Sequence, residues 1–130
     1  MSIKWLDRRI AALGPYLTLC LNESEFKQAL KQLDEPPLGY WISKGSDAVV
    51  HHLSNKNGEV VCILCIHVPD GKSPIEIAGL LVHEAVHVFQ KYCQYIGEDS
   101  PASEQEAYGI QHISQTLMGE YARRIQEQKT

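Results

Sequence analysis

Residues 73–95 read SPIEIAGLLVHEAVHVFQKYCQY, and this stretch decides the fold because it predicts one long helix. Ser73 and Glu76 form the pattern of a capping box, in which each side chain can accept the backbone N–H of the other residue. Pro74 stands at the first helical position, where its missing N–H has no partner to lose. The rest of the stretch contains no proline. We therefore expect a helix of about six turns over residues 74–95.

The middle of this predicted helix carries two histidines and a glutamate in the pattern HExxH, as His83, Glu84 and His87. Four residues advance a helix by slightly more than one turn, so both imidazoles project from one face and can bind a single metal ion. Glu84 is then held close to the open position of that metal. This arrangement is typical of a Zn²⁺ site whose glutamate takes a proton from zinc-bound water.

The alternative for the same residues is a buried amphipathic helix whose histidines are satisfied by hydrogen bonds in the core. Two imidazoles and a carboxylate are costly to enclose among neighbours such as Leu81 and Val88 without a strong partner. A metal ion supplies that partner, so we favour the metal site.

A catalytic zinc site needs a third protein ligand, and the next predicted helix, over residues 101–126, offers one. Residues 97–101 predict a turn and a capped helix start, with Ser100 as the N-cap and Pro101 at the first helical position. Glu106 and Ala107 follow shortly afterwards.

With HExxH and Glu106-Ala107 the chain resembles the gluzincins, metallopeptidases in which HExxH on one helix is completed by a glutamate, often followed by alanine, on the next. The resemblance implies that Glu106 is the third zinc ligand. It covers roughly residues 73–117, and the compact form is similar to minimal gluzincin-type domains of small bacterial and phage-encoded proteins. The longer HExxHxxGxxH motif of metzincins is absent, and no substrate-binding lobe is recognisable.

Two other side chains compete with Glu106 as the third ligand. Glu104 lies nearly opposite Glu106 around the helix, so only one of them can face the metal. An antiparallel partner helix returns to the level of His87 near residue 109, which favours His112. Glu106 must therefore extend toward the metal at the level of His87, or the first helix must end early. We rank Glu106 first, His112 second and Glu104 third, and a solvated first-turn glutamate is the alternative for each acidic residue.

Length and charge exclude several classes of protein. The 130 residues predict a single domain, 1–130, with one core. The net charge of −4, without a basic stripe, argues against a nucleic-acid binder. The longest apolar run, residues 60–66, is far shorter than the ~20 residues of a membrane span. Charged residues at 7–9 interrupt any apolar signal sequence, so we expect a cytoplasmic protein without a membrane partner.

Cys62 and Cys65 form a CxxC pair, a spacing used in zinc and redox sites. They lie in residues 59–68, a β-branched run that predicts a strand, and residues three apart on a strand point to opposite faces. These two thiols therefore cannot share a metal ion unless the strand breaks. We expect all four cysteines to be reduced and buried.

The remaining segments predict a small sheet and two shorter helices. We expect helices over residues 2–13 and after the Asn22–Glu25 capping box as far as Pro36, and strands over 16–21, 39–43, 47–53 and 59–68. Asn57-Gly58 predicts a hairpin between the last two strands. This order indicates an α+β fold, in which a small, largely antiparallel sheet packs on the zincin-like active-site helix and a second ligand-bearing helix follows.

Residues outside the motif are assigned supporting roles. His51 and His52 are adjacent on a predicted strand and point to opposite faces, so at most one can approach the zinc. For each of them the favoured interpretation is a surface or hydrogen-bonded histidine. Gln90, one turn beyond His87, is placed to orient that ligand. By resemblance to zincins, one strand within 47–68 is a sheet edge that binds extended substrate through backbone hydrogen bonds.

The sequence therefore predicts a zinc-dependent hydrolase, a metallopeptidase that acts on a peptide or protein substrate. His83, His87 and Glu106 would hold Zn²⁺, and Glu84 would be the general base that activates zinc-bound water. The alternative is a zinc-stabilised binding or regulatory module that keeps the scaffold and cleaves nothing. Small size favours the module, whereas Glu84 favours the hydrolase, because a structural zinc site does not need a carboxylate there. Oligomeric state is left open.

Overall fold

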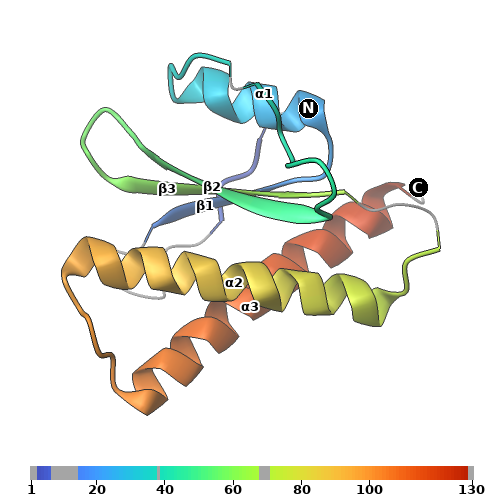
Figure 1. Cartoon of the computed structure of the whole chain (residues 1–130). Coiled ribbons are helices and arrows are strands. Elements are labelled where there is room, and N and C mark those ends of the chain that lie inside the picture. The colour runs from blue at the N-terminus through green and yellow to red at the C-terminus, as the bar shows by residue number, and fades with distance from the viewer. Residues whose placement is uncertain (1–2, 7–14, 38, 68–70, 129–130) are drawn as a thin grey trace.

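The computed structural model describes residues 3–6, 15–37, 39–67 and 71–128. In these residues α1 (Glu23–Gln32) covers one face of a three-stranded sheet, and α2 (Pro74–Ile96) and α3 (Ser103–Gln128) cover the other, as Figure 1 shows. The strands are β1 (Tyr16–Cys20), β2 (Ala48–Ser54) and β3 (Val60–Ile66). The predicted α+β class is confirmed.

The sheet has the strand order β1-β3-β2, so β3 is central and β2 is an edge strand. β2 pairs antiparallel with β3, and β1 pairs parallel with it, which makes the sheet mixed. Every residue of β3 is buried. A strand that is covered on both faces needs apolar side chains on both, which explains the continuous apolar run in this part of the sequence.

The predicted hairpin between β2 and β3 is confirmed. Gly58 has φ +78°, a left-handed conformation that glycine adopts without steric cost. Backbone bonds from His67 N to Asp47 O (2.8 Å) and from Asn55 N to Glu59 O (3.0 Å) bracket the hairpin. They set the phase of the ladder, in which the odd-numbered residues of β2 bond to β3. The N–H and C=O groups of the even-numbered residues therefore point away from β3, toward the open edge.

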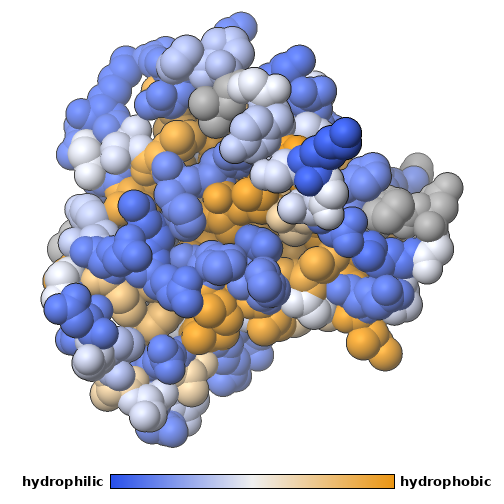
Figure 2. Space-filling view, viewed as in Figure 1, coloured by the Kyte–Doolittle hydropathy of each residue, from blue (hydrophilic) through white to orange (hydrophobic). Residues whose placement is uncertain are grey.

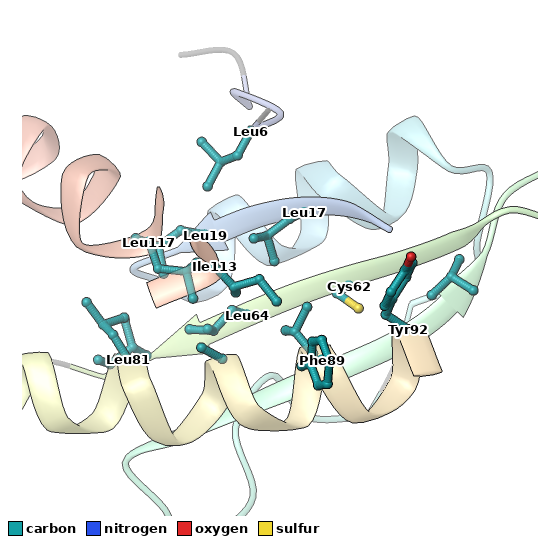
Figure 3. Packing of buried hydrophobic residues seen from close by; sticks show 14 of the residues in the cluster. Leu6, Leu17, Leu19, Cys62, Leu64, Leu81, Phe89, Tyr92, Ile113 and Leu117 are labelled. Atoms are coloured by element: carbon teal, nitrogen blue, oxygen red, sulfur yellow. The ribbon is translucent and has the colours of Figure 1, made fainter. Parts of the chain in front are cut away.

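Two apolar clusters lie on opposite faces of the sheet. Figure 3 shows the larger cluster, which joins the sheet to α2 and α3 and includes Leu17, Leu19, Leu64, Leu81, Ile113 and Leu117. The smaller cluster joins the sheet to α1 through Phe26, Ala29 and Leu30. Cys62 belongs to the larger cluster and Cys65 to the smaller one, which confirms that the CxxC thiols point to opposite faces. All four cysteines are free and buried.

The predicted capping box at the start of α2 is confirmed. Ser73 N donates to Glu76 Oε1 (3.0 Å), and Glu76 N donates to Ser73 Oγ (3.1 Å). The helix ends at Gly97, which takes the left-handed conformation with φ +73°. No helix in the described part of the chain combines the length and the apolar character that crossing a bilayer requires.

Three local predictions differ from the structure. Residues 39–43 form no strand, because Trp41 and Ile42 pack against the smaller cluster and Trp41 O bonds with the His51 ring instead (2.7 Å). α3 begins at Ser103 rather than Pro101, since the helical hydrogen bond that opens it runs from Glu106 N to Ala102 O (2.9 Å). Of the predicted helix over 2–13, residues 3–6 are not helical and the rest lies outside the described residues.

Candidate metal centre

His83 and His87 lie side by side on the outward face of α2. Their ring centroids are 5.0 Å apart, and the side chain of His83 is 67% exposed. The opposite face of α2 supplies Leu81, Ala85 and Val88 to the core, each 0% exposed. Figure 2 shows a largely hydrophilic band along the outward face of α2, between hydrophobic patches. The two histidines are therefore surface residues, which overturns the alternative of core histidines.

A neighbouring glutamine orients one of these imidazoles. His87 Nδ1 lies 3.1 Å from Gln90 Oε1. In the tautomer that carries its proton on Nδ1, this contact is a hydrogen bond to the amide oxygen, and the lone pair of the ring is on Nε2. Metal-binding histidines commonly have this arrangement, in which one nitrogen donates to the protein and the other binds the metal. The predicted contact of Gln90 with His87 is present.

Glu84 occupies a different environment from the two histidines that flank it in the motif. Its residue exposure is 6%, and its Oε1 lies 4.0 Å from His83 Nε2. Burial raises the pKa of the Glu84 carboxyl, and positive charge on His83 and His87 opposes part of that rise. A carboxyl with a raised pKa holds a proton more readily than a solvated one, as a group that accepts and returns protons must.

Glu106 does not join this group in the structure. It is exposed in the first turns of α3, where α3 diverges from α2 (Figure 1). Its negative charge, after burial and Glu98, contributes to the raised pKa of Cys93, in the last turns of α2. Cys93 is six residues past His87, or about 9 Å along the helix axis. Within the described residues, no three His, Cys, Asp or Glu side chains are gathered closely enough to hold a metal ion.

The other two candidates on α3 have contrasting surroundings. His112 is half-buried, and its Nε2 is buried without a hydrogen-bond partner in the described part of the protein. Glu104 is exposed near the beginning of the helix. The donor chemistry of the centre fits zinc, and α2 presents two imidazoles in suitable positions, but the third ligand is not in place.

The two histidines of β2 face opposite sides of the sheet, as their adjacency predicts. His51 stacks on Phe26 on the α1 side, with ring centroids 4.5 Å apart. His52 faces α2, and its Nδ1 lies 3.5 Å from Cys62 Sγ. Burial lowers the pKa of His52, and positive charge on Lys91 and His87 lowers it further. His52 is therefore the histidine of the pair that approaches the candidate metal centre.

Sequence reasoning missed Lys91, which faces β2 from the next turn of α2. The available signal was its spacing, since Lys91 follows His87 by four residues and Glu84 by seven and so lies on the same side of the helix as Glu84.

No protein-family model matches this chain, and no curated protein or solved structure is significantly similar to it.

Proposed function

We propose that this protein is a zinc-dependent hydrolase that cleaves peptide bonds, with His83 and His87 as zinc ligands. The observation that carries the proposal is the pair of exposed imidazoles, 5.0 Å apart, beside a buried carboxyl whose pKa is raised. Zn²⁺, when bound, supplies a Lewis acid that polarises a carbonyl and acidifies water.

Glu84 is the general base in this proposal. A buried carboxylate gains more from accepting a proton than a solvated one, which suits it to deprotonate the attacking water. The same carboxyl then returns the proton to the leaving amine, so its charge is restored after each cycle. The proximity of Glu84 Oε1 to His83 Nε2 supports this role, because it holds the base beside the ligand face.

Glu106 remains our proposed third ligand. Glu106 is exposed in the first turns of α3, and its carboxylate has no hydrogen bond or ion pair with a described residue. It is therefore free to move, but it must come closer to His87 than it lies in this structure. A shift of the first turns of α3 toward α2 would bring it closer.

The open edge of β2 supports a peptide substrate. β2 is packed beside α2, and the outward N–H and C=O groups of Val50 and His52 have no hydrogen bond to another described segment. An extended peptide can add to such an edge as a further strand, with its backbone held by the groups that β3 leaves free. Its scissile bond would then lie beside the HExxH face.

The four cysteines support a cytoplasmic location, which we include in the proposal. All of them are free thiols, and all are buried. Free thiols persist in reducing compartments, where disulfides are rare.

One observation favours the non-catalytic alternative. Nε2 of His112, which is buried and has no hydrogen-bond partner among the described residues, offers a further donor on α3. If His112 and Glu106 both joined His83 and His87, the four positions of a tetrahedral zinc site would be filled by protein, as in structural sites. An anomalous-scattering structure of the zinc-loaded protein would count the ligands directly.

The substitution Glu84→Gln tests the proposed hydrolase. We expect the rate of peptide cleavage to fall by at least about 10²-fold, because the general base is lost, while the zinc content stays unchanged. Peptide-library cleavage and elemental mass spectrometry measure these two quantities. Glu23→Gln, which changes an exposed glutamate of α1, is the matched control and should retain activity. Turnover by the Glu84→Gln variant at the rate of the parent would refute the role of Glu84.

A further inference from the structure

A cleft of about 470 Å³ lies between β2 and the last turns of α2, beside the candidate metal centre. Polar side chains line much of it, among them His52, Ser54, Lys91, Gln94 and Tyr95. No carboxylate is among the described residues that line it. In a chain with a net charge of −4, a cleft that holds a cation and no acid is a site that favours an anion.

Lys91 provides that positive charge. Its side chain is half-buried, and no carboxylate of the described residues lies within ion-pair distance of it. Lys56 and Lys72, by contrast, pair with Asp34 and Asp47. The positive charge of Lys91 acts on His52 across the cleft, where it contributes to the lowered pKa of that histidine. The charge of Lys91 is therefore directed into the cleft and is not neutralised there.

The cleft is continuous with the open edge of β2. His52 and Ser54 line it, and both are even-numbered residues whose backbone groups point away from β3. A peptide strand paired with this edge presents alternate side chains to the α2 side of the sheet. One of those side chains, or the end of the peptide, would enter the cleft next to Lys91.

We propose that this cleft binds a negatively charged group of a peptide strand paired with β2, and that Lys91 is the charge partner of that group. The group is a carboxylate, carried either by an acidic side chain or by the end of the peptide. The hydroxyls of Ser54 and Tyr95 and the amide of Gln94 offer neutral donors for its remaining lone pairs. The proposal rests on the peptide-hydrolase function above and makes Lys91 a determinant of its specificity.

Binding to the zinc-loaded Glu84→Gln variant tests the proposal without cleavage. The probes are three sets of short peptides: blocked peptides with glutamate at each position in turn, the same peptides with glutamine, and the glutamine peptides with a free terminal carboxylate. We expect one anionic set to bind about fivefold more tightly than the glutamine set, as measured by calorimetry. The set that gains identifies the source of the carboxylate.

Variants of Lys91 then test whether the preference for anionic peptides depends on this lysine. In the same background, Lys91→Met should remove the preference and Lys91→Glu should reverse it, whereas Lys27→Met, an exposed lysine of α1, should leave it unchanged. Equal affinity for all three sets, no binding of any set, or a preference that survives Lys91→Met overturns the proposal.

A parallel cleavage assay with the unsubstituted protein separates the two proposals. Cleavage without any charge preference would contradict the cleft proposal and would be consistent with the hydrolase proposal. A Lys91-dependent preference in peptide binding, in a protein that cleaves no peptide, would contradict the hydrolase proposal and would be consistent with the cleft proposal.

Discussion

The imidazole of His87 is held by the contact between its Nδ1 and Gln90 Oε1, which leaves Nε2 as the atom that can bind a metal. We expect Gln90→Ala to lower zinc affinity by about tenfold, because the ring loses the partner that selects its tautomer and orientation. The free energy of unfolding should change little, since both side chains are exposed. A competitive zinc titration measures the affinity. Gln94→Ala, one turn further along the same face, is the control, and equal losses in both variants would contradict the role of Gln90.

Alternation along β2 was predictable at the scale of single residues, because two successive side chains on a strand must point to opposite faces. Adjacency alone does not say which of His51 and His52 faces the metal-bearing helix. The structure assigns His52 to that side, since β2 places its even-numbered residues against α2 and its odd-numbered residues against α1.

At the scale of elements, the start of α2 is the best-defined helix boundary. Ser73→Ala removes the side chain that accepts Glu76 N, and we expect it to lower the free energy of unfolding by about 1 kcal/mol. Urea denaturation measures this change. The matched control is Ser100→Ala, at the position where the sequence predicts an N-cap but α3 has not yet begun. A loss at Ser100 as large as the loss at Ser73 would contradict the boundaries described here.

The two serines illustrate why one boundary was predictable and the other was not. Around Ser73, the cap, the proline and the glutamate all favour the same first turn, and no nearby group competes for it. Around Ser100, the serine and Pro101 are present, but Ser103 stands where a capping box needs a glutamate, and Glu98 in the preceding turn accepts the backbone N–H of Ser100. Without the full capping box at Ser100, the first helical hydrogen bond runs from Glu106 N to Ala102 O (2.9 Å), and α3 begins two residues later than predicted.

At the scale of the whole molecule, a buried ion pair connects the last turns of α3 to the beginning of α1. Arg124 binds Glu25, and both residues are less than 10% exposed. Arg124→Met should lower the free energy of unfolding by about 3 kcal/mol, because it leaves the carboxylate of Glu25 buried without its partner. Chemical denaturation measures the loss. Lys56→Met, which breaks an exposed pair with Asp34, should cost less than about 1 kcal/mol, and similar losses in the two variants would contradict the prediction.

Glu120 makes the stability of the same region depend on pH. Burial by itself would raise the pKa of Glu120, but the hydrogen bond from Arg123 and the charges of Arg123, Lys4 and Arg124 outweigh it, so the pKa is lowered. The stabilisation is therefore present above the ordinary value of 4.5 and is lost as the pH falls through the lowered pKa. Denaturation at a series of acidic pH values should show a smaller loss of stability for Glu120→Gln than for the unsubstituted protein. An equal loss of stability with falling pH in the two proteins would contradict this prediction.

The sequence by itself determined α2, its cap, its two histidines and the buried central strand, because each depends on side-chain period and on hydrogen bonds within a few residues. It also indicated that His83 and His87 share a face, since four residues nearly complete one helical turn.

Only the tertiary structure decided the parallel pairing of β1 with β3, the edge position of β2, and the level at which α3 meets α2. These depend on contacts between residues far apart in the chain, such as the packing of Ile113 and Leu117 against Leu81. The angle at which α3 crosses α2 is set by such contacts and by no local rule. The sequence therefore could not show that Glu106 does not lie with His83 and His87.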